Sequence, residues 1–320
     1  MTAQRFEDRT ITFANGATGL HVDVPTANPS DYRQVIGSSA SMPRMQIAAK
    51  LFLPPRAAGP FPAVICVPGS AGVQPALIGH AEALTDLGIA ALVIDPFGAR
   101  AVTSTVANQT QFSFAASAFD VLAAARVLAE TSGIDPSRIG AEGHSRGGSA
   151  VMTAATERFA AAVGAPRLRA VYAAYPWCGH QFLDARVGQT RVRAVIGTRD
   201  EWCSPQQVQG CINAIRLTGG DVSFRLVPGA HHAFDRMHAP ELEPNARVSP
   251  NAPTVYIADD GTMIDPCTGE AEPAATERSL MVQALKLGFG VTGAHMGTLE
   301  DQRALFRADM TAFWREAFTA

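Results

Sequence analysis

The chain has 320 residues, of which 47% are hydrophobic and 17% are charged, and its formal net charge is -3. A chain of this kind can bury a large core, so the composition argues against a largely disordered protein. The sequence contains no long run of like charges, which argues against nucleic acid or an anionic membrane as the partner. We therefore expect the partner to be a small molecule.

The N-terminal sequence MTAQRFEDRT lacks the basic and then apolar layout of a signal peptide. No apolar run approaches the roughly 18 residues that span a bilayer, so we expect no membrane partner. A cytoplasmic location is the simplest expectation, with export of a trimmed precursor as the alternative. Five cysteines are scattered without a CxxC pair, which indicates neither a zinc site nor a thioredoxin-like motif. We expect no metal site.

The chain before residue 60 contains two expected strands, at 9–14 and 45–53, separated by a polar stretch that contains proline. They predict an antiparallel extension of a sheet. From residue 62, short β-branched apolar runs alternate with longer helical stretches, which predicts an α/β fold with a mostly parallel central sheet and helices on both faces. The expected parallel strands are 63–68, 90–95, 138–143, 169–175, 193–198 and 222–227.

The clearest helix lies within 112–131, where apolar residues recur every three or four positions. Residues 236–274 interrupt the α/β alternation, and the sequence TVYIADDGTMID within them predicts a hairpin that turns at Asp260-Gly261. We interpret 236–274 as an insertion near the ligand-binding face, either a lid or the contact of a homodimer. The whole chain is expected to form one domain over 1–320, with 1–60 as an N-terminal extension.

A final amphipathic helix is expected at about 299–318, with Thr298 as its N-terminal cap and Asp301 at the N3 position. The apolar stripe of this helix recurs at helical spacing and comprises Leu305, Phe306, Met310, Phe313, Trp314 and Ala317. We expect this stripe to pack on the sheet.

The sequence Gly143-His144-Ser145-Arg146-Gly147 has the form G-x-S-x-G. It follows an expected strand and precedes a helical stretch, which is the setting of a nucleophile elbow, a sharp turn that presents a serine at the carboxyl end of the sheet. Glycines on both sides let the neighbouring strand and helix come close. Ser145 is therefore the candidate nucleophile.

A serine nucleophile requires a base and an orienting carboxylate. Asp200 comes just after one expected strand, and the pair His231 and His232 comes just after the next. The order serine, acid, histidine is that of α/β hydrolases. Glu201 and Asp235 are alternative acids, and the string His231, His232, Asp235, His238 matches no zinc spacing.

The sequences GHSRGG, GTRDEW, GAHHAF and DPFGAR together resemble the dienelactone hydrolase family of the α/β-hydrolase superfamily. The resemblance covers about 45–235 and the last helix. It implies hydrolysis of a carboxylic ester or lactone without a cofactor. The namesake enzymes carry a cysteine nucleophile, whereas this chain has Ser145, as esterase-like relatives do. Family members place the base before a small residue and Phe, which favours His232.

The negative charge that develops during acyl transfer needs backbone N–H donors. We expect one from Arg146 and another from Ser70 or Ala71 in the loop after the first parallel strand. Glu142 lies inside an expected core strand, where a carboxylate needs a partner. We leave that partner open between Arg100, Arg146 and a histidine.

Candidate pocket residues follow the strands at the same edge of the sheet: Phe97, Trp177, Trp202 and His231. They predict a partly apolar acyl or aryl site. For Arg100 we favour pairing with Asp95 over reading a substrate carboxylate. A serine peptidase or acyltransferase on the same fold is the alternative enzyme, and a non-catalytic binding protein is the alternative outside catalysis.

Overall fold

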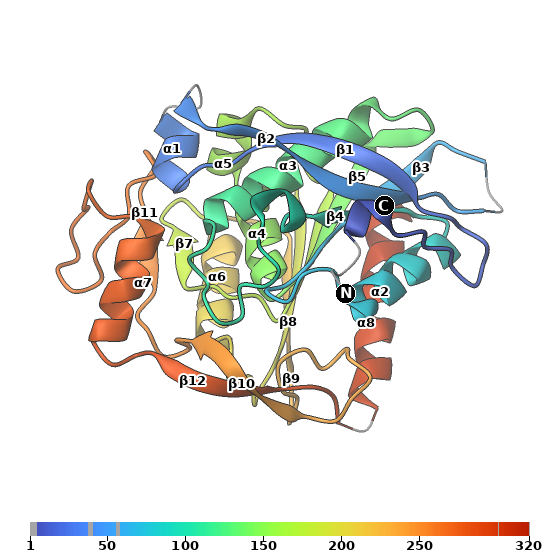
Figure 1. Cartoon of the computed structure of the whole chain (residues 1–320). Helices are drawn as coiled ribbons and strands as arrows, with labels where there is room; N and C mark the ends of the chain where they lie inside the picture. The colour runs from blue at the N-terminus through green and yellow to red at the C-terminus, as the bar shows by residue number, and fades with distance from the viewer. Residues whose placement is uncertain (1–4, 38–40, 56–57, 300, 320) are drawn as a thin grey trace.

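The computed structural model describes residues 5–37, 41–55, 58–299 and 301–319. These residues form an eight-stranded sheet in the order β1-β2-β4-β3-β5-β6-β8-β9 (Figure 1). Strands β3, β4, β5, β6, β8 and β9 run parallel to one another, whereas β1 and β2 are antiparallel to their neighbours. The strand bounds are β1 Leu20–Ala27, β2 Arg44–Phe52, β3 Phe61–Val67, β4 Ala90–Asp95, β5 Ile134–His144, β6 Ala170–Ala174, β8 Arg191–Gly197 and β9 Val222–Val227.

The predicted mostly parallel sheet and all six of its predicted strands are confirmed. The central strands β3, β4, β5 and β6 are buried on both faces. This is why they read as continuous apolar runs and not as an alternating pattern. The register aligns Val64 with Ala91 on one side and with Gly140 on the other, so the parallel strands end at one common edge.

The N-terminal extension is antiparallel as expected, but one of its two strands was placed wrongly. The expected strand at 45–53 is β2, whereas the expected strand at 9–14 is absent and Thr12 forms only an isolated bridge to Thr18. The second strand is β1, inside the polar stretch. An edge strand is exposed along one side and tolerates Pro25, so its sequence lacks the apolar run that marks the inner strands.

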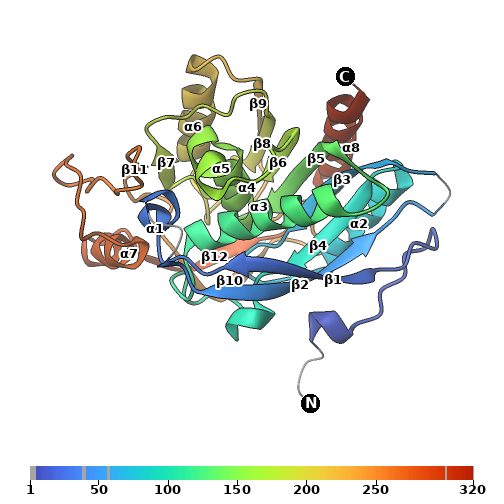
Figure 2. The ribbon, with the colours of Figure 1, turned by 90° about the horizontal axis from the view of Figure 1, so that it is seen from above.

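Helices cover both faces of the sheet (Figure 2). Helices α2 and α8 lie on one face, and α3, α4 and α6 lie on the other. The helix bounds are α1 Tyr32–Gly37, α2 Pro75–Asp86, α3 Phe114–Glu130, α4 Arg146–Ala155, α5 Glu157–Val163, α6 Pro205–Leu217, α7 Glu277–Lys286 and α8 Gln302–Thr319, with short 3-10 helices at Phe6–Asp8 and Gly98–Arg100. Within the described residues, no helix combines the length and the hydropathy needed to cross a bilayer.

The last helix confirms the predicted stripe but not the predicted cap. All the stripe residues are buried except Leu305, which packs against the core at partial exposure. The helix begins at Gln302, so Thr298 lies too early to cap it. The backbone N–H of Thr298 donates to the carbonyl of His238 at 2.9 Å, which makes this residue part of a loop pairing.

Residues 238–297, called the covering segment here, interrupt the α/β alternation over a longer range than the expected 236–274. Strand β10 (Glu241–Val248) pairs antiparallel with β12 (Val291–Met296), beyond α7. The expected turn at Asp260-Gly261 is present, with Gly261 at a φ of 84°. The expected hairpin is only one bridge long, because β11 (Val255–Ile257) pairs in parallel with β7 (His180–Phe182).

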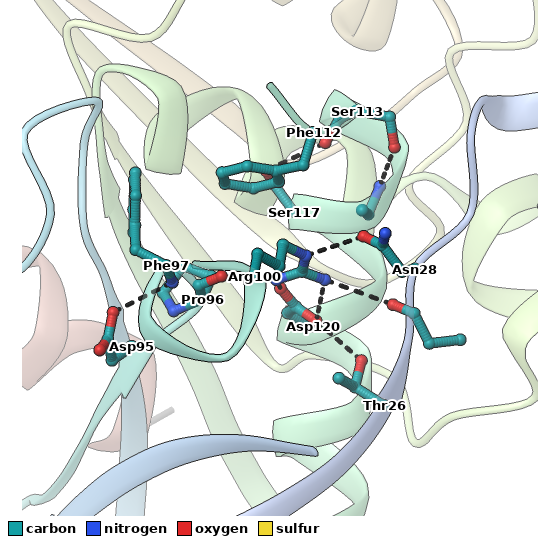
Figure 3. Close-up of polar contacts among 12 residues, drawn as sticks. Thr26, Asn28, Asp95, Pro96, Phe97, Arg100, Phe112, Ser113, Ser117 and Asp120 are labelled. Carbon is teal, nitrogen blue, oxygen red and sulfur yellow. Dashed lines mark hydrogen bonds and ion pairs between the residues drawn. The ribbon is translucent and has the colours of Figure 1, made fainter. Parts of the chain in front are cut away.

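The expected pairing of Arg100 with Asp95 is wrong. Arg100 pairs with Asp120 of α3 at 2.7 Å, and both side chains are buried (Figure 3). The same carboxylate accepts a hydrogen bond from Thr26 of β1 at 2.7 Å. The Asp95 carboxylate accepts from the backbone N–H of Phe97 at 3.0 Å. Arg100 also donates to the Asn28 side chain and to the carbonyls of Pro96 and Ala27.

We predict that Asp120→Ala lowers the free energy of unfolding by about 3–5 kcal/mol, because it leaves the buried Arg100 cation without its counterion. Urea denaturation measures this loss. The matched control is Asp221→Ala, which removes an exposed carboxylate that pairs with Arg191 at the surface and should cost less than about 1 kcal/mol. Equal losses in the two variants would contradict the role given to the buried pair.

Candidate active site

Ser145 occupies a strained turn between β5 and α4. Its backbone has φ 54° and ψ -115°, a conformation that costs energy for a residue with a Cβ. Two hydrogen bonds hold it: the Ser145 N–H donates to the Ala174 carbonyl at 2.9 Å, and the Ser149 N–H donates to the Ser145 carbonyl at 3.0 Å. The side chain is thereby presented at the carboxyl edge of the sheet.

The glycines of the motif allow three backbones to meet at this turn. A Cβ on Gly143 would lie 2.0 Å from the carbonyl oxygen of Gly147, and a Cβ on Gly147 would lie 2.4 Å from that of Val67. Neither contact can be relieved by a side-chain movement, because both partners are backbone atoms. The predicted strand-turn-helix setting of Ser145 is therefore present.

The structure brings Ser145, His232 and Asp200 together in one hydrogen-bonded chain. His232 Nε2 lies 3.0 Å from Ser145 Oγ, and His232 Nδ1 lies 2.8 Å from Asp200 Oδ2. The other oxygen of Asp200 accepts from the backbone N–H groups of Trp202 and Cys203 at 2.9 and 2.8 Å. The carboxylate is thus fixed by its own loop and aimed at the imidazole.

Each of these side chains follows a different parallel strand. Ser145 follows β5, Asp200 follows β8 and His232 follows β9. The imidazole of His232 is stacked on Trp202 at a centroid distance of 5.2 Å and meets the ring of Tyr175 edge-on at 4.7 Å. These two rings restrict the orientation of the imidazole.

The residues that the sequence offered as alternatives to Asp200 and His232 make other contacts. Glu201 pairs with His295 at 2.9 Å, and Asp235 accepts from the Tyr175 hydroxyl at 2.7 Å. The ring of His231 lies near His295, with centroids 6.2 Å apart. Asp200 is the carboxylate that the structure places against His232.

Two adjoining cavities meet at Ser145. The first is lined by the loop after β3, including Ser70 and Ala71, together with Trp202 and His232. The second is lined by Trp177, Trp202, Phe114, Arg146 and four residues of the covering segment, namely Arg247, Val248, Ser249 and Met281. These four were missed because nothing local in the sequence shows that a distant segment folds back over the site.

Two of the four expected pocket residues are not brought to these cavities. Phe97 is buried in a separate small cluster, edge-on to Phe112 at 5.3 Å. His231 lines neither cavity. Trp177 and Trp202 lie where expected. Phe97 directly precedes the 3-10 helix Gly98–Arg100, and its side chain clusters with Phe112 and Ala116 instead of lining the cavities.

The expected oxyanion donors also lie beside Ser145. Arg146 is the first residue of α4, where a backbone N–H has no partner within the helix. Ser70 and Ala71 share a cavity with Ser145. The preceding Gly69 allows close approach, because a Cβ there would lie 3.0 Å from the carbonyl of His144.

The Arg146 side chain is held by contacts with the neighbouring loops. Its guanidinium donates to the Gln109 carbonyl at 3.0 Å and lies over the rings of Phe112 and Phe114 at 4.3 and 4.1 Å. Burial lowers its pKa to about 10. The side chain therefore braces the loops around the turn.

The partner of Glu142 is histidine, one of the three options left open. Its Oε1 lies 2.9 Å from His80 Nδ1 and 3.1 Å from His144 Nε2, and its Oε2 accepts from Trp314 Nε1 at 2.8 Å. Burial would raise the pKa of Glu142, but the hydrogen bonds with His144 and His80 lower it to about 2. His80, in the middle of α2, was missed by the sequence reasoning.

Glu277 anchors the covering segment and was also missed. Its carboxylate accepts from the backbone N–H groups of Phe114 and Ala115 at 2.5 and 3.0 Å, at the N-terminus of α3. Burial raises its pKa to about 7. Because Glu277 begins α7, this contact holds α7 against the core next to the second cavity.

We predict that Gly143→Ala destabilises the fold by at least about 3 kcal/mol, since the added methyl group overlaps backbone at the turn. The matched control is Gly210→Ala in α6, where a Cβ meets no atom within 4 Å. That control should be neutral or stabilising by about 1 kcal/mol. Urea denaturation compares the two, and a Gly143→Ala variant as stable as the control would contradict the close approach.

Comparisons with known proteins show the family to which the chain belongs. Residues 47–257 match the dienelactone hydrolase family. Among solved structures, the chain is similar to a Klebsiella pneumoniae protein assigned as a dienelactone hydrolase, with 19% identity, a TM-score of 0.50 and coverage of 68% of this chain and 89% of that one. No curated protein matches the chain in sequence.

Two further solved structures are similar at lower TM-scores. One is a dienelactone hydrolase-like promiscuous phosphotriesterase from metagenomic libraries, with 19% identity, coverage of 68% and 86%, and a TM-score of 0.47. The other is a dienelactone hydrolase from Anabaena variabilis, with 18% identity, coverage of 67% and 88%, and a TM-score of 0.44. The family match spans more than half of the chain, including Ser145, Asp200 and His232. The chain thus belongs to the dienelactone hydrolase family and is a carboxylic ester hydrolase with the α/β-hydrolase fold.

Proposed function

We propose that the protein cleaves a small-molecule carboxylic ester or lactone through an acyl-enzyme formed on Ser145. The observation that carries this proposal is the hydrogen-bonded chain from Ser145 Oγ to His232 and on to Asp200, with distances of 3.0 and 2.8 Å. Its parts have the roles that nucleophilic acyl transfer requires: a hydroxyl, a base in contact with it and a carboxylate that orients the base.

In the first half-reaction, His232 Nε2 takes the proton of Ser145 as Oγ attacks the substrate carbonyl carbon. Asp200 accepts a hydrogen bond from Nδ1–H and stabilises the imidazolium that forms. The negative charge passes to the carbonyl oxygen, which the backbone N–H groups of Arg146 and of Ser70 or Ala71 would stabilise. His232 then protonates the leaving alkoxide, and the carbon–oxygen bond of the ester breaks.

In the second half-reaction, His232 removes a proton from water, which attacks the acyl carbon and releases the acid. Ser145 recovers its proton from the imidazolium. Besides the substrate and water, the groups that take part in these steps are side chains and backbone N–H groups of the chain. The cavity that holds Trp177, Trp202, Phe114 and Met281 supports an apolar or aromatic acyl group.

Kinetics with a short p-nitrophenyl ester series test these roles. Ser145→Ala and His232→Ala should each lower kcat by about 10^4-fold or more, and Asp200→Asn by about 10^3-fold to 10^4-fold, because the residues act as one unit. The matched control is Glu201→Gln, which alters the neighbouring carboxylate that faces His295. The control should keep activity close to the wild type.

Two results would contradict this assignment. One is a loss of activity in Glu201→Gln that equals the loss in Asp200→Asn, which would remove the distinction between the two acids. The other is ester hydrolysis that survives in Ser145→Ala.

The alternative of a serine peptidase or an acyltransferase shares the first half-reaction, so the acceptor decides between them. Adding an alcohol or an amine to the ester assay separates water from other acceptors. A product dominated by the free acid supports the hydrolase, whereas a product dominated by the new ester or amide supports an acyltransferase. Cleavage of peptide amides in preference to esters would support a peptidase.

A further inference from the structure

A buried cluster of two histidines and two carboxylates lies directly behind the Ser145 turn. His80 comes from α2, Glu142 and His144 come from β5, and Asp235 comes from the loop after β9. Their exposed fractions are 9%, 0%, 6% and 2%. The proposed reaction uses none of these side chains. Four ionisable groups out of water in one place are costly unless they serve each other or a ligand.

Three donor atoms of the cluster form a small triangle. His80 Nδ1, His144 Nε2 and Glu142 Oε1 are separated by 2.9, 3.1 and 3.1 Å. Each imidazole nitrogen has one in-plane position, which carries either a proton or a lone pair. Here His80 Nδ1 and His144 Nε2 each have one such position, and each faces both the other nitrogen and Glu142 Oε1.

Protons satisfy this triangle in one arrangement only. With a proton on both nitrogens, both N–H groups donate to Glu142 Oε1, with the two nitrogens 3.1 Å apart. A proton on neither would turn two lone pairs toward each other and toward a carboxylate oxygen. A proton on one leaves the lone pair of the other facing that oxygen. A single cation above the triangle would accept all three lone pairs at once.

The remaining atoms of the cluster suit the outer shell of such a cation. Histidines that bind metals usually donate their second ring N–H to a carboxylate. His80 Nε2 and His144 Nδ1 both face Asp235 Oδ2, at 3.4 and 4.0 Å. That oxygen is buried and has no hydrogen-bond partner among the described residues, so the two imidazoles lie near it without donating to it. Trp314 Nε1 fixes the second oxygen of Glu142 at 2.8 Å.

We propose that His80, Glu142 and His144 bind one divalent first-row transition-metal ion, with Asp235 orienting the two imidazoles. A metal about 2.1 Å from each donor would see them at angles of about 90°, which is the facial arrangement of two histidines and one carboxylate in an octahedral site. Two nitrogen donors disfavour calcium and magnesium, which prefer oxygen. No bound metal is needed for the Ser145 chemistry.

An adjoining cavity of about 300 Å3 gives access to this site, because His80 and Asp235 form part of its wall. Three arginines, Arg236, Arg303 and Arg307, also line the cavity. Their positive charge makes the cavity itself a poor place for a cation, so the ion belongs at the donor triangle. Solvent in the cavity would complete the coordination.

The ion would tie α2 to β5, and through Asp235 to the loop that carries His232. Its expected effect is therefore on stability: a ligand that binds the folded chain raises the free energy of unfolding by mass action. The ligands must lose their protons first, so binding should weaken as the pH falls. The proposal is independent of the acyl-enzyme mechanism.

The test uses full-length, tag-free protein that has been stripped with a chelator. Mn2+, Co2+, Ni2+ and Zn2+ are added separately, and the metal retained after desalting is measured by mass spectrometry. Visible absorption reports the Co2+ coordination, and Tm is recorded with and without metal. We expect one ion per chain for at least one of these metals, with a Co2+ d–d band and a higher Tm.

Variants locate the ion. His80→Ala and Glu142→Gln should lose stoichiometric binding and the Co2+ band, and Asp235→Asn should weaken binding by about 10-fold to 100-fold. The matched control is His21→Ala, which removes a surface histidine that also pairs with a carboxylate and should leave binding unchanged. Circular dichroism confirms that each variant is folded.

Folded wild-type protein that retains none of the four metals would overturn the proposal, whatever the variants do. Retention of one ion per chain by folded His80→Ala would also overturn it. Loss of the ion in His21→Ala with retention in Glu142→Gln would move the site to the surface and contradict the assignment.

Discussion

The backbone conformation of Ser145 is the constraint on which the site depends. A residue with φ 54° and ψ -115° is stable only where the surrounding chain holds it there. This conformation is maintained by the close approach of Gly143 to Gly147 and of Gly147 to Val67. The Ser145 N–H also donates a hydrogen bond to the Ala174 carbonyl. Because β3, β5 and β6 all contribute, the sheet must be formed before the serine is presented.

The same edge of the sheet carries the other two residues of the proposed triad. Asp200 and His232 follow β8 and β9, and the parallel register brings both level with Ser145. His232 lies 87 residues from Ser145 in the sequence, and Asp200 lies 32 residues from His232. The covering segment then adds Met281 and its neighbours to the second cavity, and Glu277 holds that segment to α3. The sheet thus sets the chemistry, and the added segment shapes the space in which a substrate would lie.

Much of this arrangement follows from patterns local to the chain. Apolar runs mark the inner strands, and the G-x-S-x-G turn together with strand ends locates Ser145, Asp200 and His232. Contacts between distant segments do not leave such patterns. The partner of Arg100 is Asp120, and the anchor of the covering segment is Glu277, 163 residues from Phe114. The edge strand β1 was not predicted, because one of its sides is exposed and its sequence therefore has no apolar run.

The most direct test of the central claim is intact-mass measurement of the protein after reaction with a fluorophosphonate, for the wild type and for Ser145→Ala. The probe modifies a serine whose hydroxyl is activated by a base. Its reaction therefore reports whether His232 activates Ser145, and no substrate needs to be known. One adduct per wild-type chain, absent from folded Ser145→Ala, is the predicted result. An unmodified wild type that is folded, or an adduct that persists in Ser145→Ala, would contradict it.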